Sequence, residues 1–411
     1  MQWFKAPPKV YFKRGATDLA LRILKGKKRA FIVTDRYLFN SGAIYNVTSI
    51  LDELDIDFQI FFDIKPDSTM EIIEDAMAIL KPYEPDLIIA LGGGSPIDTA
   101  KFLWLLYEQP DVDLSEITLK FVDIENGINK IPSLGNKASL VCIPTTSGSG
   151  SEVTPFTIIK DNEKNIKYAI ADQSLTPNIA IVDPNFVDSM PKGLTSASGM
   201  DALVHALEAY VSCMSTNFTN SNALEATKLI FRYLERSYNE GKNDPLAREK
   251  MHYASTIAGL AFANSFIGIC HPMAHQLSAA FNMPHGVSKA LLLRQIIKYN
   301  SKELLKYNTD SFASFHSVKA KYGQVADELG LGGNSDDEKV ELLIKAVDNL
   351  MTSIQLPKSL KSLGIKEEIF MEKVDELTNS ITSIVEKCIK PYDNFAQDIK
   401  QIYIDVYNGN I

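Results

Sequence analysis

DLIIALGGGSPIDTAK, residues 86–101, is the segment that decides the fold. It has the pattern of a short apolar strand, a turn of three glycines and a helix that carries Pro96 in its first turn, where a missing N–H costs no hydrogen bond. Glycines let a phosphate approach the backbone, and a helix N-terminus offers N–H groups and the positive end of a dipole. The segment therefore predicts phosphate binding, although it lacks the GxGxxG pattern of the usual dinucleotide fingerprint.

Strands and helices alternate on both sides of this segment. Further apolar runs of strand length are 29–34, 57–62, 139–143 and 179–182. Helical patterns between them are 41–54, 69–80 and 97–107. Strands separated by helical patterns of about 10–15 residues indicate right-handed βαβ units and a parallel sheet.

The pattern changes after Asp183-Pro184, where strand signals become rare and helical spacing dominates. Expected helices lie near 199–213, 219–238, 246–265, 272–281, 286–307, 338–354 and 393–407. We therefore expect an α/β dinucleotide-binding domain with a parallel sheet over residues 1–190, followed by an all-α domain over residues 191–411.

Composition excludes several classes of protein. The 411 residues are 45% hydrophobic and 23% charged, as in ordinary globular proteins, and a net charge of −9 argues against nucleic acid or an anionic membrane as a partner. The four cysteines form no CxxC pair, so we expect buried, reduced thiols. Met1–Lys5 has no signal-peptide pattern, and we expect a cytoplasmic location. Uncharged Ala254–Cys270 contains polar residues and glycines, which favours a buried core helix over a membrane span.

Two more features of the first half suit a nucleotide but have plainer explanations. TTSGSGSE (145–152) follows an expected strand, and it is either a flexible linker or a hydroxyl-rich loop for a pyrophosphate or ribose. Asp35 ends the first expected strand, and it is either a turn residue or an acceptor for a ribose diol that repels a 2′-phosphate. Because Asp35 precedes the glycine turn, the usual spacing argument does not apply to it.

The second half carries a group of potential metal ligands. These are Asp201, His205, His271, His275 and His285. The first two are four positions apart and share a helix face, and the next two repeat that spacing. A carboxylate with several imidazoles is typical of a site for Zn²⁺ or Fe²⁺. Three of these histidines lie in Met251–Ser288, which has no Asp, Glu, Lys or Arg, so we expect a dry site. Spacing alone leaves open which of those three histidines bind the metal.

Four segments together resemble the iron-containing, group III alcohol dehydrogenase family. They are GGGSPIDTAK (92–101), TTSGSGSEVTPF (145–156), GMDALVHALEAYVS (199–212) and CHPMAHQLSAAFNMPHGVSKALLL (270–293). Within the family, the chain is most similar to the alcohol dehydrogenase half of bifunctional aldehyde-alcohol dehydrogenases of fermenting microbes. The segments that indicate this are WFKAPPKVYFKRGA (3–16), VTDRYLFNSG (33–42) and ASTIAGLAFANSFIG (254–268).

The resemblance implies roles for individual residues. The implied metal ligands are Asp201, His205, His271 and His285, with His275 beside them as a proton relay. The implied cofactor contacts are Gly93, Gly94, Ser95, Thr145, Thr146 and Lys167, with Asp35 favouring NAD over NADP. The implied substrate-pocket residues are Phe262 and Ile267.

The implied activity is the interconversion of a short-chain aldehyde, acetaldehyde first, with its primary alcohol, here ethanol, in fermentation. Hydride passes between NAD(H) and the substrate carbon while a divalent metal, Fe²⁺ before Zn²⁺, polarises the substrate oxygen. The resemblance also implies a homodimer, and a filament only when the chain is fused to an aldehyde dehydrogenase half. Nothing in this chain resembles that half, so we expect an excised domain or a free-standing homologue. The alternatives are an enzyme of the glycerol dehydrogenase or dehydroquinate synthase type, and a purely structural assembly module.

Overall fold

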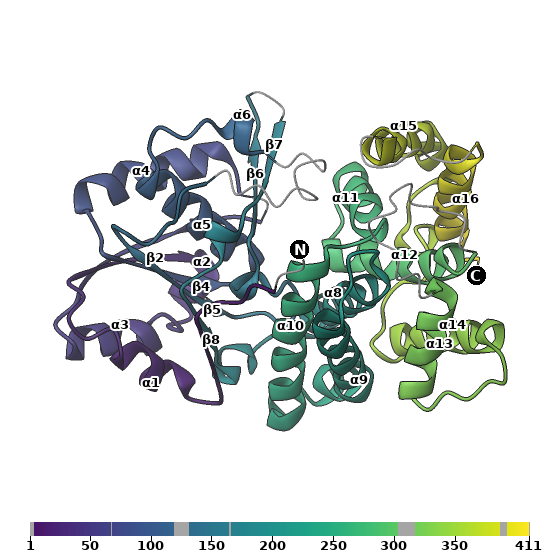
Figure 1. Cartoon of the computed structure of the whole chain (residues 1–411), viewed down its shortest axis with the longest axis horizontal. Helices are drawn as coiled ribbons and strands as arrows, with labels where there is room; N and C mark the ends of the chain where they lie inside the picture. Colours follow the sequence, from purple (N-terminus) through teal and green to yellow (C-terminus); the bar gives the residue numbers. More distant parts are fainter. Residues whose placement is uncertain are drawn as a thin grey trace. The chain divides into compact units, whose positions relative to one another are not determined.

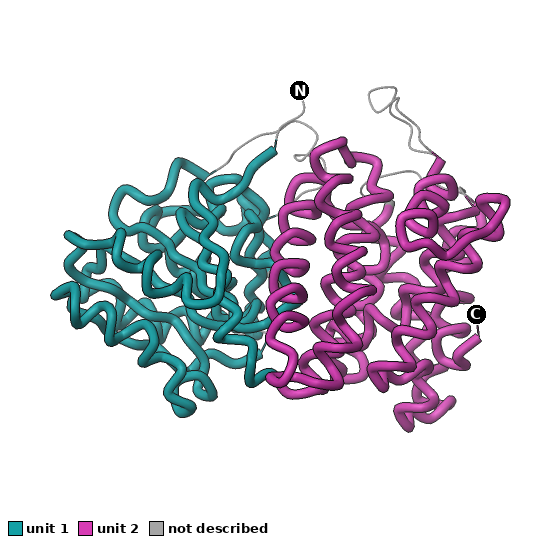
Figure 2. The backbone as a smooth tube through the Cα atoms, turned by 90° about the horizontal axis from the view of Figure 1, so that it is seen from below, with its two compact units in different colours: residues 1–190 teal, residues 191–411 magenta. Residues whose placement is uncertain are grey.

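The computed structural model describes residues 4–66, 68–118, 131–163, 166–302, 317–386 and 393–410. The chain divides into two compact units, Met1–Met190 and Pro191–Ile411, which Figure 2 colours separately. The first unit contains a parallel sheet with helices, and the second is built from helices. The fold class expected from the sequence is thereby confirmed.

A six-stranded, all-parallel sheet forms the centre of the first unit, with the strand order β1-β8-β5-β4-β2-β3. Its strands are β1 Lys9–Phe12, β2 Arg29–Asp35, β3 Asp57–Ile64, β4 Leu87–Gly92, β5 Ser139–Pro144 and β8 Ile179–Val182. The helices are α1 Ala16–Arg22, α2 Arg36–Asn40, α3 Tyr45–Glu53, α4 Met70–Tyr83, α5 Gly94–Glu108 and α6 Leu114–Ile117. Strands β6 Phe156–Asp161 and β7 Ile166–Ala171 form a separate antiparallel hairpin.

Both faces of the central strands are buried. Phe31 and Val33 of β2 belong to a core with residues of α4 and α5, whereas Ala30 and Ile32 belong to a second core with residues of α1 and α3. Figure 1 shows these two pairs of helices on opposite faces of the sheet. Burial on both faces explains why the central strands are continuously apolar in sequence instead of alternating with polar residues.

The strand order places a topological switch point between β2 and β4. The chain passes from β2 to β3 on one side and then returns to β4 on the other side of β2. In open parallel sheets, ligands bind at the carboxyl ends of the strands at such a point. The glycine turn after β4 and the acidic end of β2 both lie there.

Nine helices of the described residues form the second unit. They are α8 Lys192–Val211, α9 Asn217–Glu240, α10 Pro245–Ser265, α11 Cys270–Phe281, α12 His285–Asn300, α13 Val318–Glu328, α14 Asp336–Ser353, α15 Glu367–Glu386 and α16 Phe395–Asn408. Helix α8 packs against α9, α10 and α12. A Cβ added to Gly286 would lie 2.0 Å from the Ala197 carbonyl oxygen, so only glycine allows α12 to begin this close to α8.

Short 3₁₀ helices occur in both units, at Ser151–Val153, Gln173–Leu175, Pro184–Val187, Gly241–Asn243 and Lys361–Leu363.

Some elements differ from the sequence expectations. The helix expected over 41–54 is α3, which begins only at Tyr45 because Gly42 adopts a left-handed conformation with φ 79°. Strand β1, the β6–β7 hairpin and helices α1, α2, α6, α13 and α15 were not expected. Helix α12 ends at Asn300, and residues 303–307 of the expected helix lie outside the described residues.

The expectation that every cysteine is buried is wrong for one of them. Cys142 and Cys270 are buried, but Cys213 is exposed because it lies in the turn after α8. Cys388 lies outside the described residues.

The uncharged segment 254–270 is mostly part of α10. Its side chains Ala254, Ala258, Ala261 and Phe262 are buried within the unit. Among the described residues, we find no single helix with both the length and the apolar composition of a membrane span; α10 and α11 reach that composition only together, across a bend of 112°.

Candidate functional site

The glycine turn and the hydroxyl-rich loop pack together at the carboxyl edge of the sheet. Gly92 of β4 is in register with Pro144 of β5, and the Thr145 amide donates to the Gly92 carbonyl over 3.0 Å. A Cβ added to Gly93 would lie 3.1 Å from Thr146 Cγ2. Segment 145–152 is therefore a packed loop and not a flexible linker.

The first backbone N–H groups of α5 lie at this edge of the sheet. Helix α5 begins at Gly94, two residues earlier than Pro96, and among the described residues no side chain caps it. Its first amides, including that of Ser95, therefore depend on another acceptor, and a phosphate is a suitable one. The glycines keep that approach open, so the residues present fit a dinucleotide.

A buried lysine of α5 binds the residues that directly follow the hydroxyl-rich loop. Lys101 is fully buried, and its Nζ donates to the carbonyl oxygens of Thr154 and Phe156 over 2.6 and 3.0 Å. Burial lowers the pKa of Lys101 and raises the pKa of the neighbouring Asp98 to about 6. The hydrogen bonds of Lys101 therefore tie the end of this loop and the start of β6 to α5.

Asp35 lies at the carboxyl end of β2 and caps α2. Its Oδ1 accepts a hydrogen bond from the Leu38 amide over 2.9 Å. This hydrogen bond agrees with the interpretation of Asp35 as a turn residue. It involves only one of the two carboxylate oxygens, so the interpretation of Asp35 as an acceptor for a ribose diol stays open. Lys167 is in β7, paired with Lys160, but its side chain lies outside the described residues.

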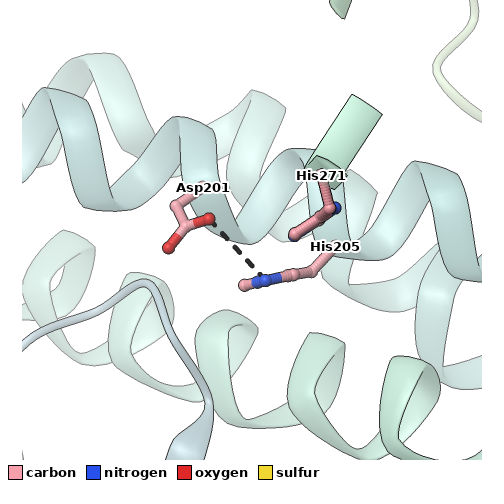
Figure 3. A group of neighbouring side chains, drawn as sticks. All are labelled: Asp201, His205 and His271. Atoms are coloured by element: carbon pink, nitrogen blue, oxygen red, sulfur yellow. Dashed lines mark ion pairs between the residues drawn. The ribbon is translucent and has the colours of Figure 1, made fainter. Parts of the chain in front are cut away.

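Three of the expected metal ligands converge inside the second unit. Asp201 and His205 lie one turn apart on α8, and His271 lies in the first turn of α11. One donor atom of each lies within 4.8 Å of the others, and Figure 3 shows Asp201 and His205 as an ion pair with His271 beside them. The rings of His205 and His271 stack with centroids 4.7 Å apart.

A buried glutamate that the sequence reasoning missed contacts His271. Glu208 Oε2 bonds the Nδ1 of His271, and Oε1 accepts from the Cys270 amide over 2.7 Å. Burial raises the pKa of Glu208 to about 8, and burial together with nearby positive charge holds the pKa of His271 well below its ordinary value. His271 is thus a neutral imidazole, the form that binds metals.

The other ring nitrogen of His271 is buried and available to a ligand. Among the described residues, the buried Nε2 meets no hydrogen-bond partner. A carboxyl group that holds one ring nitrogen of a histidine orients the other nitrogen for a metal. Asp201, His205 and His271, with one donor atom of each within 4.8 Å of the others, form a donor set that fits Fe²⁺ or Zn²⁺.

A buried lysine, also missed, lies against the same group. Lys289 of α12 forms an ion pair with Asp201, and its Nζ is 3.5 Å from His205 Nε2. Burial is the largest single influence on the pKa of Asp201 and would raise it, but the charge and hydrogen bond of Lys289 act together with His205 and His285 to lower the pKa. Helices α8 and α12 thus bring the charged side chains of Asp201, Glu208 and Lys289 next to the uncharged segment 251–288.

The remaining predicted residues lie around this group. His285 begins α12, and its ring lies 4.8 Å from that of His275, tilted by 59°. His285 is not among the three residues whose donors converge within 4.8 Å, so its role as a ligand stays a prediction. The Phe262 ring stacks on His205 at 4.3 Å, whereas Ile267 is 37% exposed in the turn before α11.

Weak signals for the two missed residues exist in the sequence. Glu208 follows His205 by three positions and Asp201 by seven, so all three share one face of α8. Lys289 follows His285 by four positions and is the first charged residue after the uncharged segment Met251–Ser288. Without the packing of α12 on α8, neither position distinguishes a site residue from an ordinary surface charge.

Comparison with known proteins gives the family. Residues 7–184 match the family model for iron-containing alcohol dehydrogenase, and residues 195–407 match the C-terminal model of the Fe-containing alcohol dehydrogenase family. A bifunctional aldehyde-alcohol dehydrogenase of Escherichia coli strain K12 is 42% identical over 100% of this chain and 46% of its own length. The chain thus spans about half the length of the bifunctional relatives it matches.

Two other relatives match over their whole length. An NADPH-dependent butanol dehydrogenase of Clostridium saccharobutylicum is 37% identical, over 100% of this chain and 99% of its own. The crystal structure of a 1,3-propanediol oxidoreductase superposes with a TM-score of 0.86 at 30% identity, covering 99% of this chain and 100% of that one. On these matches, the chain belongs to the iron-containing alcohol dehydrogenase family, whose members use a divalent metal and a nicotinamide cofactor.

Proposed function

We propose that this chain interconverts a short-chain aldehyde and its primary alcohol with NAD(H), with acetaldehyde and ethanol as the first pair to test. The observation that carries the proposal is the buried group of Asp201, His205 and His271 in a chain of this family. A second support is its 42% identity to bifunctional aldehyde-alcohol dehydrogenases.

Asp201, His205, His271 and His285 would hold the metal. A bound divalent cation, Fe²⁺ before Zn²⁺, supplies a Lewis acid for the substrate oxygen. Glu208 fixes the ring of His271, and the stacked ring of Phe262 fixes that of His205. These contacts orient both imidazoles before a metal arrives, which reduces the reorganisation that binding requires.

His275 is the proposed proton carrier. It lies one turn after His271 on α11, it is only half buried, and its ring lies beside that of His285. A half-buried imidazole can exchange a proton with solvent and pass it to the alcohol oxygen. Phe262 and Ile267 are proposed to contact the substrate's carbon chain.

NAD(H) is proposed to bind along the carboxyl edge of β2, β4 and β5. Gly93, Gly94 and Ser95 would receive the pyrophosphate at the start of α5, and Thr145, Thr146 and Lys167 would contact the rest of the cofactor. Asp35 would accept hydrogen bonds from the ribose diol and repel the 2′-phosphate of NADP.

The test is the oxidation of NADH and of NADPH by the purified chain with acetaldehyde, butyraldehyde and 3-hydroxypropionaldehyde. Each assay is run after chelation and again after adding Fe²⁺ or Zn²⁺. We expect metal-restored turnover that is fastest with NADH and acetaldehyde. Turnover that favours NADPH and butyraldehyde would assign the chain to the activity named for the butanol relative. No turnover with any metal would overturn the proposal.

A further inference from the structure

The side chain of Lys289 lies against the group of potential metal ligands. It extends from α12 into the group of Asp201, His205 and His271, and only 6% of the side chain is exposed. Its Nζ contacts the Asp201 carboxylate and lies 3.5 Å from His205 Nε2. Two of the three converging donors therefore face an ammonium group.

We infer that Lys289 is an internal cation that competes with the divalent metal for Asp201 and lowers the metal affinity of the site. This inference rests on the proposed function, because it requires that the three donors bind a metal. The Asp201 oxygen that pairs with Lys289 is Oδ1, the same oxygen that lies 3.7 Å from His205 Nε2 on the side of the imidazoles. A metal that joins this oxygen to the two rings must displace the ammonium group.

The charges at the site favour this competition. The Lys289 ammonium group and the Asp201 carboxylate form a buried ion pair, so their opposite charges already compensate each other. When a divalent ion binds to this neutral pair, the net charge of the site becomes +2. Without the ammonium group, the same ion would leave a charge of +1, which a buried site tolerates better.

The backbone of Lys289 cannot move away to relieve the conflict. Its carbonyl oxygen accepts a bond from Cys270 Sγ at 3.8 Å, and α12 packs closely on α8 at Gly286. The side chain alone must therefore swing aside when a metal binds. Its four-carbon stem permits this, but Nζ then leaves its carboxylate partner.

The experiment measures the dissociation constant of Zn²⁺ and Co²⁺ by competition with a coloured chelator, at one pH and ionic strength. The variants are Lys289→Met, which removes the charge at similar length, and Lys289→Arg, which keeps it. Lys298→Met on the exposed side of α12 is the matched control. We expect Lys289→Met to bind metal at least about 10-fold more tightly, which is about 1.4 kcal/mol. Lys289→Arg and Lys298→Met should remain within about threefold of the parent chain, a spread of under 1 kcal/mol.

Thermal unfolding provides a second readout. Lys289→Met leaves the buried Asp201 charge unpaired, so the metal-depleted variant should unfold at a lower temperature and gain more from added Zn²⁺ than the parent chain does. If the variant folds only with metal present, the rate at which a chelator removes the metal replaces the equilibrium measurement, and slower removal than from the parent is the expected result.

The outcomes separate this inference from the proposed function. Equal or weaker metal binding by Lys289→Met, while the parent chain binds one metal that Asp201→Asn loses, would overturn the inference and leave the proposed function standing. Absence of metal binding in the parent and in Lys289→Met would overturn both.

Discussion

The two candidate binding regions of this chain are built in different ways. At the sheet edge of the first unit, the proposed cofactor contacts come mainly from backbone, namely that of Gly93, Gly94 and the amino end of α5. In the second unit, side chains from α8, α11 and α12 make the site, and a buried glutamate and lysine adjust it. The first kind of site follows from one short segment, whereas the second exists only after three helices pack.

The largest expected effect tests whether the two regions are separable. His271→Ala removes a metal donor, so we expect loss of metal from the purified chain and a fall in turnover of at least about 10³-fold, since metal catalysis supplies several kcal/mol. NADH affinity, measured by fluorescence titration, should change less than about twofold, under 0.5 kcal/mol. His275→Ala is the matched control and should keep its metal. Equal metal content in His271→Ala and the parent would refute the ligand assignment.

The converse variant acts on the first region. Gly93→Val places a branched side chain where even a Cβ would lie 3.1 Å from Thr146. We expect NADH to bind about 10-fold more weakly or worse, because overpacking costs about 1–3 kcal/mol, while the metal content stays the same. The control is Gly193→Ala, since an added Cβ there meets no described atom within 4 Å. Unchanged NADH binding in Gly93→Val would remove the glycine turn from the cofactor site.

A third variant tests the one side chain of the first region that is proposed to select between NAD and NADP. Asp35→Asn removes the charge of Asp35 but keeps a residue that can still cap α2. The ratio of NADPH to NADH use should rise by about 10-fold, or about 1.4 kcal/mol, as a repulsion with the 2′-phosphate disappears. An unaltered ratio of kcat/KM values would remove Asp35 from the ribose site.

The smallest expected effect concerns the buried acid of the second region. The folded-state pKa of Glu208 is raised to about 8 from 4.5, so the folded chain binds this proton more tightly than the unfolded chain does. Its contribution to stability is therefore fully present below pH 4.5 and is lost as the pH rises through 8.

Denaturant titrations of the metal-depleted chain at pH 6.5 and 8.5 measure this loss. The parent should lose roughly 1 kcal/mol or more relative to Glu208→Gln between these pH values, since one pKa unit corresponds to about 1.4 kcal/mol. Parallel stability changes in the two proteins would show that Glu208 does not titrate in this range.

The same contrast explains which features the sequence predicts. DLIIALGGGSPIDTAK contains a strand, a turn and a helix start in consecutive residues, and β4 and α5 follow it closely. The i, i+4 spacing of Asp201 and His205 was equally easy to recognise in the sequence, because both residues lie on one helix. Glu208 and Lys289 were not identified as site residues because their relation to His271 and Asp201 arises from the packing of α8, α11 and α12.

The strands that were not expected from the sequence also depend on pairing with another segment. Strand β1 has only four residues at the edge of the sheet, and its pairing with β8 joins residues far apart in sequence. Hairpin β6–β7 follows the hydroxyl-rich loop, and its alternating pattern is interrupted by charged residues such as Lys160 and Asp161. A pattern search along one segment detects neither kind of partner.

An anomalous difference map from crystals grown with Zn²⁺ tests the central claim most directly. We predict one strong peak per chain within bonding distance of Asp201, His205 and His271, with His285 turned towards it and Lys289 turned away. A map with no peak at that position, or with Lys289 still bonded to Asp201 while the zinc lies elsewhere, would contradict the account.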